Sequence, residues 1–356
     1  MRALATVDCG DLMPTLGRPM HRSPIVIAHR GASGYAPEHT LVAYFIAMQQ
    51  GTDYIEPDLV MTRDGVLVAR HENEISQTTD VAQHPQFAQR RSRKLIDGFA
   101  VEGWFTEDFT LAELKRLRAV ERLPQLRRCN ARLDGMFEIP TLDEILTMVA
   151  ALQPARANLV GVYPETKHPS YFASLGLPME PLLVQTLERH GYRGRTAPVF
   201  IQSFETANLR ALRKLTELPL VQLVEERGQP FDFAQSGDAR SYADLLAQPG
   251  LQDVAGYADA IGVNKNLILP HDGKGGLAQP TTVNEDAHAA GLRVHAWTLR
   301  AENQFLPQVL RKGGDAAAHG DLAAEIEAFL AAGVDGFFTD HPDLGVRARD
   351  RFVRAF

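Results

Sequence analysis

The sequence predicts an α/β fold, a (β/α)8 barrel of the TIM type that carries an antiparallel hairpin addition and a small capping insertion. Short apolar runs, typical of buried strands, alternate with helix-like segments from about residue 24 to the end of the chain. A strong turn signal marks one pair of strands as a hairpin. Charged side chains gather at the ends of the apolar runs, where barrel enzymes place their chemistry.

Nine apolar runs qualify as strands. They are Ile25–Ala28, Tyr54–Leu59, Val66–Arg70, Leu159–Tyr163, Val199–Gln202, Leu220–Leu223, Ala260–Val263, Arg293–Trp297 and Gly336–Phe338. Helical segments lie between most of them, for example Leu41–Gln50, Leu182–His190, Glu205–Lys214, Val283–Ala290 and Ala323–Ala332. Four of these helices are followed by a glycine of the kind that caps a helix C-terminus, namely Gly51, Gly191, Gly291 and Gly333.

One of the strands is expected to lie outside the barrel, because a barrel of this type needs only eight. Asp64-Gly65 is a hairpin signal, whereas a parallel return would need a crossover of a dozen or more residues. The runs 54–59 and 66–70 are therefore predicted to pair antiparallel. If Asp64 and Gly65 alone form the turn, Asp58 lies opposite His71, with Cα atoms roughly 4.5 to 5.5 Å apart.

The domain organisation follows from where this alternation holds. Residues 1–23 are predicted to be an irregular leader, and residues 24–356 a single barrel domain with a capping insertion at about 77–138. Long excursions of this kind are often functional. Two helix starts inside this frame are well marked, since Thr110-Leu-Ala-Glu113 and Thr141-Leu-Asp-Glu144 fit the capping-box pattern.

Composition excludes several classes of protein. The chain is 45% apolar and 23% charged, as soluble globular proteins are, and its net charge of -7 argues against nucleic-acid binding. No run approaches the ~18 to 20 apolar residues of a membrane helix, so stable membrane insertion is not expected. Cys9 and Cys129 lack metal-site spacing. No signal peptide is recognisable, which predicts a cytoplasmic protein, or a periplasmic one if a signal was removed.

Three acids are candidate metal ligands. Glu56 and Asp58 stand two apart on one predicted strand and so project from the same face, and Glu165 ends the run that begins at Leu159. Carboxylate oxygens suit Mg²⁺ or Ca²⁺ better than zinc, and three of them close together would repel each other without a cation. Taken singly, an acid at a strand end is more often a solvated surface residue, but the apolar strand beside Glu56 and Asp58 argues against that interpretation.

His29 and His71 are the candidate general acid and base. Cleavage of a phosphodiester must deprotonate a nucleophile and protonate a leaving alkoxide, and histidine can do both near neutral pH. A lone histidine after a strand is more often a packing residue, but two beside three carboxylates favour catalysis. His39, His168, His271, His295 and His341 lack such neighbours in the sequence and are assigned structural roles, although His39 and His168 could line the same mouth.

Four further side chains are candidates for binding substrate. Arg30 can hold a phosphate with two hydrogen bonds, and Lys167 faces the same side of an extended chain as Glu165. Each fits equally well as a rim salt bridge. Phe204 and Trp297 end later strands, where an aromatic either packs in the core or lines the pocket for the organic part of a substrate.

Several motifs together resemble the glycerophosphodiester phosphodiesterase family. They are AHRGASGYAPEHT, IEPDL with its DG hairpin, VARHE, YPETK, IQSF, HAWTLR and GFFTDHP, and the likeness extends over nearly everything from Ile25 to Asp340. The resemblance implies a capped TIM barrel that hydrolyses glycerophosphodiesters, such as glycerophosphocholine, to glycerol 3-phosphate and an alcohol. It also implies one divalent cation, and attack by the neighbouring glycerol hydroxyl to give a cyclic phosphate that water then opens.

Carried onto this chain, the resemblance makes His29 and His71 the general acid and base and gives phosphate contacts to Arg30 and Lys167. The cation would be held by Glu56, Asp58 and Glu165. Two departures from the family pattern are visible. Glu72 follows His71 where aspartate is commoner, so a supporting acid there would need a longer arm, and His39 stands where asparagine is commoner.

Three other functions compete with this one. A lysophospholipase D or sphingomyelinase-type enzyme on the same fold would need a wide apolar approach, and no lipid-binding amphipathic helix is evident. A non-catalytic protein that captures phosphodiesters would be expected to lack one histidine, and both are present. A metal-dependent amidohydrolase would want histidine-rich metal ligation, and no His-x-His follows the first predicted strand.

Overall fold

The computed structural model describes residues 23–153 and 159–355, so the predicted leader lies almost entirely outside the described residues. The strands of the large sheet are β1 (Ile25–His29), β2 (Tyr54–Glu56), β3 (Asp58–Met61), β4 (Leu67–Ala69), β7 (Gly161–Val162), β8 (Glu165–Thr166), β9 (Ile201–Ser203), β10 (Leu220–Val224), β11 (Ala260–Asn264), β12 (Arg293–Leu299) and β13 (Gly336–Thr339). A separate hairpin consists of β5 (Ser92–Ile96) and β6 (Phe99–Gly103).

The parallel strands close into a barrel. β1 pairs with β13 on one side and with β2 on the other, and parallel pairing continues from β8 through β9, β10, β11 and β12 to β13. Two barrel strands are each split by a proline, Pro57 between β2 and β3 and Pro164 between β7 and β8. Proline supplies no ladder N–H. Because β2 pairs with β7 and β3 with β8, the described strands form the predicted eight-stranded parallel ring.

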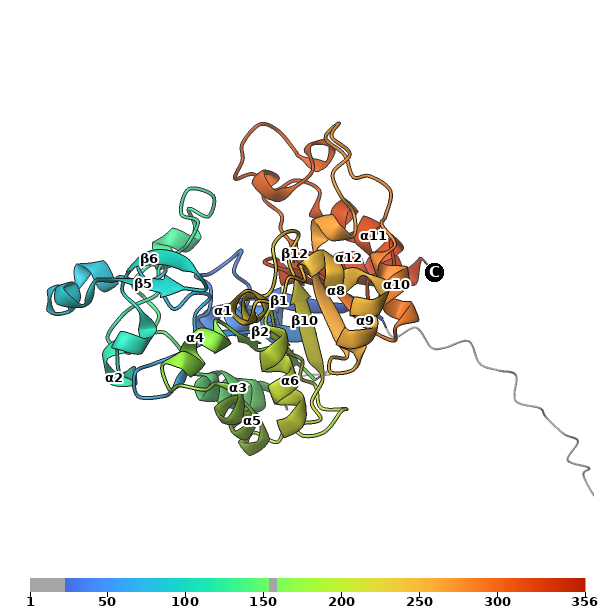
Figure 1. The fold of residues 1–356 in the computed structure, drawn as a ribbon. Helices are drawn as coiled ribbons and strands as arrows, with labels where there is room; N and C mark the ends of the chain where they lie inside the picture. The colour runs from blue at the N-terminus through green and yellow to red at the C-terminus, as the bar shows by residue number, and fades with distance from the viewer. Residues whose placement is uncertain (1–22, 154–158, 356) are drawn as a thin grey trace, which may run out of the picture.

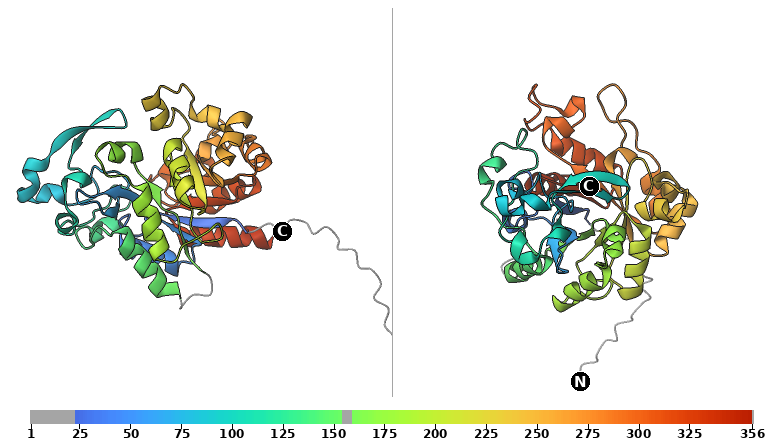
Figure 2. Two further views of the ribbon diagram at one scale, coloured as in Figure 1. Left: turned by 60° about the horizontal axis from the view of Figure 1, so that its bottom comes forward. Right: turned by 60° about the vertical axis from the view of Figure 1, so that its left-hand side comes forward.

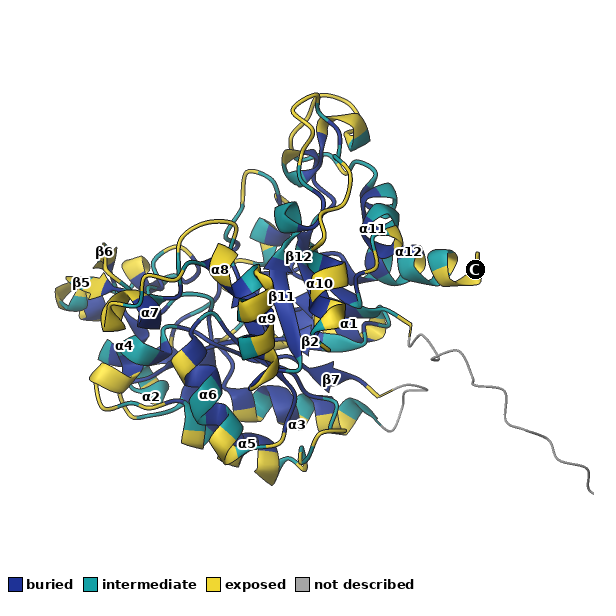
Figure 3. Cartoon of the chain, turned by 45° about the vertical axis from the view of Figure 1, so that its right-hand side comes forward, coloured by how far each residue is buried: buried dark blue, intermediate teal, exposed yellow. Residues whose placement is uncertain are grey.

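Helices surround this ring (Figure 1). They are α1 (Leu41–Gln49), α2 (Leu111–Leu114), α3 (Leu142–Leu152), α4 (Pro169–Ser174), α5 (Glu180–Arg189), α6 (Thr206–Leu215), α7 (Phe231–Ser236), α8 (Tyr242–Leu246), α9 (Gln248–Ala255), α10 (Val283–Ala289), α11 (Leu322–Ala331) and α12 (Pro342–Arg354). The barrel strands are dark blue and the outer helix faces yellow in Figure 3, as expected for strands buried on both sides.

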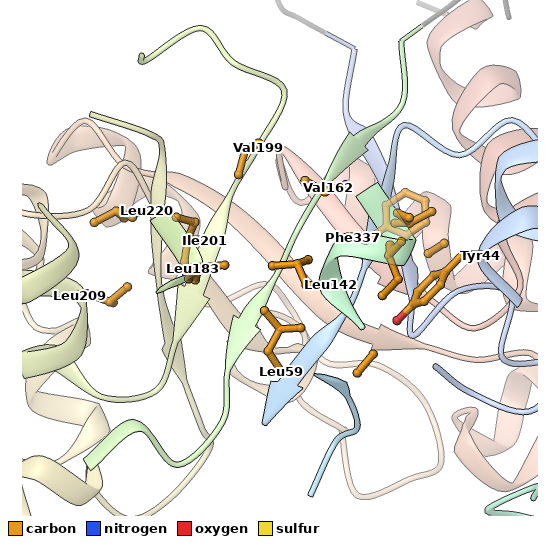
Figure 4. Packing of buried hydrophobic residues seen from close by; sticks show 14 of the residues in the cluster. Tyr44, Leu59, Leu142, Val162, Leu183, Val199, Ile201, Leu209, Leu220 and Phe337 are labelled. Carbon is orange, nitrogen blue, oxygen red and sulfur yellow. The ribbon is translucent and has the colours of Figure 1, made fainter. Parts of the chain in front are cut away.

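Apolar side chains fill both the barrel and the layer around it. Ile27, Tyr163, Phe200, Val221 and Phe338 are buried inside the barrel. A larger cluster packs strand residues against the helices, and Figure 4 shows part of it. The barrel interior is therefore a packed core, and the room for chemistry is left at the strand ends.

Both predicted capping boxes are present. Thr110 Oγ1 accepts a hydrogen bond from the Glu113 backbone N–H, and Thr141 Oγ1 accepts one from that of Glu144. In each box the glutamate carboxylate accepts the threonine backbone N–H in return. These side chains satisfy backbone donors at the first turns of α2 and α3.

The predicted hairpin forms, but its predicted register is wrong. β3 and β4 pair antiparallel with Leu59 opposite Ala69, so the partner of Asp58 is Arg70 and not His71; the Arg70 backbone N–H donates to the Asp58 carbonyl over 3.0 Å. The loop has three residues instead of two, since the Thr62 N–H bonds the Val66 carbonyl across it. Three-residue loops end in a left-handed position, which here is Gly65 with φ +76°.

The segment from 77 to 138 contains elements that the sequence analysis does not predict. β5 and β6 form a regular hairpin through Asp97-Gly98, and short 3-10 turns and α2 surround it. Figure 1 and the left-hand view of Figure 2 show this segment standing out to one side of the barrel. Asp97-Gly98 is the same two-residue turn signal as Asp64-Gly65, so the sequence did carry a clue to this hairpin.

Candidate active site

All the predicted site residues line one cavity of about 240 Å³ at the end of the barrel. They are His29, Arg30, Glu56, Asp58, His71, Glu165, Lys167, Phe204 and Trp297. His29 and Glu56 are the last residues of β1 and β2, and Glu165 begins β8 beyond Pro164. The carboxyl ends of parallel strands meet at one rim, which is why residues far apart in the sequence gather there.

The three acids converge. Glu56, Asp58 and Glu165 each offer an oxygen within 4.8 Å of the others, and all three side chains are buried. Burial, with the charges of Asp58 and Glu165, raises the pKa of Glu56 well above its ordinary value. Burial also raises the pKa of Glu165, to about 8, against the opposing charge of Lys167. The side chains around Glu56 and Glu165 therefore compensate their charges poorly. At Asp58, although burial opposes it, Lys167 and His39 hold the pKa well below its ordinary value.

The chemistry of this group fits a divalent cation. Three buried carboxylates supply hard oxygen ligands, and within the described chain Asp58 Oδ1 accepts no hydrogen bond although it is buried. Lys167 Nζ lies 2.6 Å from Glu165 Oε1 and 3.5 Å from Asp58 Oδ1, which offsets only part of the negative charge. A bound Ca²⁺ or Mg²⁺ would relieve the remaining repulsion.

Each of the two histidines has its Nδ1 on a carboxylate. His29 Nδ1 lies 2.6 Å from Asp340 Oδ1, and His71 Nδ1 lies 2.5 Å from Glu72 Oε1. Burial, with the charge of Arg30, lowers the pKa of His29 to about 4. Burial, with the charges of Arg30 and Lys167, lowers that of His71 to about 3. Both rings are therefore neutral near pH 7.

The carboxylate partners fix which ring nitrogen is available. Although burial opposes it, the charges of Arg300 and Arg127 hold the pKa of Asp340 well below its ordinary value, and the contact with His71 does the same for Glu72. An ionised carboxylate can only accept, so Nδ1 of each ring carries the hydrogen and Nε2 is left to accept a proton. Glu72 has a longer side chain than the aspartate that is commoner at this position, and its carboxylate does reach His71.

Arg30 is held close to the acids by its own backbone and side chain. Its backbone N–H donates to Glu56 Oε2 over 2.8 Å, from a left-handed conformation with φ +59°. Its guanidinium donates to Glu38 Oε2 over 3.0 Å and lies 3.4 Å from Asp58 Oδ2. Within the described chain Arg30 Nε is buried and makes no hydrogen bond, and it is the atom that forms the ion pair with Asp58.

Phe204 and Trp297 lie between this cavity and a larger one. Their rings meet edge to face with centroids 5.9 Å apart. Both also line an adjoining cavity of about 690 Å³, together with His71 and Lys167. The cavity that holds the three acids is thus continuous with a second space that has aromatic walls.

Two residues that hydrogen-bond to the three acids were not predicted as site residues from the sequence. His39 was assigned a structural role, but its Nε2 lies 2.9 Å from Asp58 Oδ2 and its Nδ1 2.7 Å from the Tyr44 hydroxyl. Gln202 Nε2 donates to Glu56 Oε1 over 3.0 Å. Both side chains orient acids of the proposed metal site. The tightly turned loop after β1 places His39 beside Asp58. Hydrophobic periodicity does not predict the path of such a loop.

Another group could hold a metal but fits one less well. Glu302, His319 and His341 also bring three ligand atoms within 4.8 Å, so His341 does have polar neighbours. However, His341 Nδ1 accepts the Ala301 backbone N–H over 3.4 Å, which leaves the hydrogen of the neutral ring on Nε2. In addition, the Arg127 guanidinium lies 2.7 Å from Glu302. Both features oppose a cation.

The chain shows extensive similarity to known proteins. Residues 29–344 match the glycerophosphoryl diester phosphodiesterase family. A glycerophosphodiester phosphodiesterase of Arabidopsis thaliana is 34% identical over 337 residues, covering 91% of this chain and 85% of that protein. A glycerophosphodiester phosphodiesterase of Haemophilus influenzae is 29% identical, covering 92% and 90%.

Solved structures share the fold. An Oleispira antarctica phosphodiesterase, determined in complex with the product sn-glycerol-3-phosphate, superposes with a TM-score of 0.61 at 21% identity and covers 92% of this chain and 97% of its own. A glycerophosphodiester phosphodiesterase from Agrobacterium tumefaciens gives a TM-score of 0.55 at 20% identity, covering 91% and 99%. Among the described residues, no helix is long and apolar enough to span a membrane.

Proposed function

Since the chain belongs to the glycerophosphoryl diester phosphodiesterase family, we propose that it is a metal-dependent enzyme that hydrolyses glycerophosphodiesters to glycerol 3-phosphate and an alcohol. The observation that carries this proposal is the convergence of three buried carboxylates with two carboxylate-paired histidines around one cavity. The glycerol-3-phosphate complex of the Oleispira antarctica relative supports the product class.

Glu56, Asp58 and Glu165 would hold one divalent cation, Ca²⁺ or Mg²⁺. When bound, such an ion polarises phosphate oxygens and offsets the charge that develops on them. Arg30 and Lys167 line the same cavity and would bind the phosphate, with Arg30 presenting a buried Nε–H that makes no hydrogen bond and lies 3.4 Å from Asp58. The carboxylates that pair with the Arg30 and Lys167 side chains hold these side chains in position beside the bound phosphate.

The two histidines would move the protons. One neutral imidazole takes the proton of the glycerol hydroxyl next to the phosphate as that oxygen bonds to phosphorus. The other ring must enter the step with a second proton on Nε2, which the charge of the bound phosphate anion favours, and it gives that proton to the oxygen of the departing alcohol as the bond from that oxygen to phosphorus breaks. Water then opens the cyclic phosphate, with the proton transfers reversed. Each Nδ1 stays on its carboxylate throughout, which keeps Nε2 directed at the reaction.

Phe204 and Trp297 would contact the organic part of the substrate at the junction of the two cavities. The second cavity is large enough to admit substrates with larger alcohols, including lysophospholipids. Assays of glycerophosphocholine against a lysophosphatidylcholine separate the two substrate classes, and the proposal expects faster turnover of the water-soluble diester.

The test is hydrolysis by protein stripped of metal with a chelator. Activity on glycerophosphocholine should vanish and return when Ca²⁺ or Mg²⁺ is added. His29→Ala and His71→Ala should remain folded, bind the ion and lose turnover. Full turnover by the stripped protein, or by either histidine variant, would contradict the proposal.

A further inference from the structure

The two histidine–carboxylate pairs are held by one short segment of the insertion. Arg122 donates to Glu72, the partner of His71, over 2.7 Å and 3.1 Å. Arg127 donates to Asp340 Oδ2, on the carboxylate that binds His29, over 2.5 Å. The two arginines are only five positions apart in the sequence, so residues 121–130 contact both pairs.

Each arginine joins its carboxylate to a second one. Arg122 also donates to both oxygens of Glu38, over 2.9 Å and 2.7 Å. Arg127 also donates to Glu302 over 2.7 Å, and its side chain is only 5% exposed. The planar guanidinium can bridge two carboxylates in fixed directions, which an ammonium cannot do.

The segment is itself fixed to the loop that follows β1. Arg127 Nη1 and Asn130 Nδ2 each donate to the Ser33 carbonyl over 3.0 Å. Ser33 Oγ in turn donates to the His29 carbonyl over 2.8 Å. Asn130 also donates to Glu121 at the other end of the segment. The arginines therefore act from a backbone that is tied to the catalytic strand end.

We propose that Arg122 and Arg127 are positioning residues that fix the two histidine–carboxylate pairs, so that the insertion is a working part of the catalytic machinery. This inference rests on the proposed roles of His29 and His71. Neither arginine lines the cavity of the three acids, so both act through the carboxylates. Their effect is to keep each Nδ1 bonded and each Nε2 in place for proton transfer.

The two arginines are expected to differ in one measurable way. Glu38, which Arg122 holds, also accepts a hydrogen bond from Arg30 Nη1 over 3.0 Å. Arg30 is a proposed phosphate ligand, so loss of Arg122 should disturb substrate binding as well as the histidine. Among the described residues Arg127 makes no hydrogen bond to a partner of Arg30, and in the unmodified protein Arg300 also contacts Asp340, over 2.8 Å.

The experiment compares Arg122→Gln, Arg127→Gln and the matched control Arg128→Gln, an exposed arginine of the same segment. Steady-state kinetics on glycerophosphocholine give kcat and KM, and calorimetry gives Ca²⁺ affinity. Arg127→Gln should lower kcat on the order of tenfold to a hundredfold, the range for partners one contact away from a ligand, with KM and Ca²⁺ affinity unchanged. Arg122→Gln should lower kcat and raise KM. Arg128→Gln should match the unmodified protein.

Arg127→Lys covers the case in which the glutamine variant does not fold. Lysine keeps the buried positive charge but cannot bridge Asp340 and Glu302, so kcat should still fall with KM unchanged. If Arg122→Gln and Arg127→Gln keep kcat within about twofold while His29→Ala and His71→Ala lose it, the inference is wrong and the proposed function stands. If kcat of Arg127→Lys falls only in step with Ca²⁺ affinity, the role is structural and the inference is again wrong.

Discussion

Glu165 is the acid that joins the two halves of the proposed metal site. Glu56 and Asp58 are separated only by Pro57, whereas Glu165 comes from the next barrel strand and lies more than a hundred positions further along the chain. Its carboxylate shares a buried space with theirs and contacts Lys167 over 2.6 Å. Removing its charge while keeping its shape therefore tests the convergence directly.

Glu165→Gln is expected to weaken Ca²⁺ or Mg²⁺ binding by at least about tenfold, since losing a ligand costs no less than losing an outer partner. The rise in melting temperature that the ion produces in the unmodified protein should disappear, because that rise depends on binding. Calorimetric titration and thermal melts measure both effects. Glu285→Gln, on an exposed face of α10, is the control and should behave like the unmodified protein. Equal affinities for the two variants would exclude Glu165 as a ligand.

At the residue scale the sequence predicted groups that end strands and missed groups that reach the site from loops. Glu56 and His29 are predictable because strand ends of a barrel share one rim. Asp340 follows β13 in the same way, but its role as the partner of His29 depends on closure of the barrel between β13 and β1. His39 and Arg127 arrive through irregular backbone, whose path no residue pattern specifies.

At the element scale α3 depends on its N-terminal cap. Thr141 Oγ1 accepts the Glu144 N–H over 3.1 Å, and Glu144 returns the bond to the Thr141 N–H over 2.7 Å. Thr141→Ala removes one half of this box and should lower the free energy of unfolding by about 1 kcal/mol. Urea denaturation measures it. Thr147→Ala, at an exposed position inside the same helix, should be neutral or slightly stabilising. If the two alanine variants are equally stable, the cap contributes nothing.

The hairpin shows why element types are more predictable than registers. The Asp64-Gly65 signal correctly indicates a tight turn, but the chain adds Arg63 to the loop and shifts every later pair by one residue. A one-residue shift exchanges the faces of a strand. His71 nevertheless reaches the cavity, because it lies beyond the last residue of β4 and is not bound by the register of the strand.

At the scale of the whole molecule, buried neutral histidines make stability depend on pH. Burial lowers the pKa of His295 and of His341 from the ordinary 6.5 to about 4. Because the folded pKa is the lower one, the unfolded chain takes up protons first as the pH falls. The stabilisation is present above pH 6.5 and is lost as the pH falls from 6.5 towards 4, by up to about 3 kcal/mol for each ring.

Urea denaturation at pH 7.5, 6.0 and 5.0 measures this loss. The free energy of unfolding should decline steadily across the series. His295→Gln keeps a polar partner for the Tyr163 hydroxyl, which lies 2.6 Å from His295 Nδ1, but cannot titrate. Its stability should therefore depend less steeply on pH. An unfolding free energy that is constant from pH 7.5 to 5.0 would show that these rings are not buried in their neutral form.

The barrel as a whole was predictable because each strand reads as a short apolar run and each connection as a helix. Proline breaks at Pro57 and Pro164 did not obscure it, since the two halves of each split strand keep the same neighbours. The arrangement of the insertion was less accessible. Its contacts to the barrel run through polar side chains such as Arg122 and Arg127, which hydrophobic patterning does not report.

The most direct measurement is an anomalous difference map from crystals grown with Mn²⁺, a scatterer that accepts the same oxygen ligands as Mg²⁺. A single strong peak is expected among the carboxylates of Glu56, Asp58 and Glu165, at coordination distance from all three. A map with no density there, or with its main peak beside Glu302 and His341, would contradict the proposed metal site and the mechanism built on it.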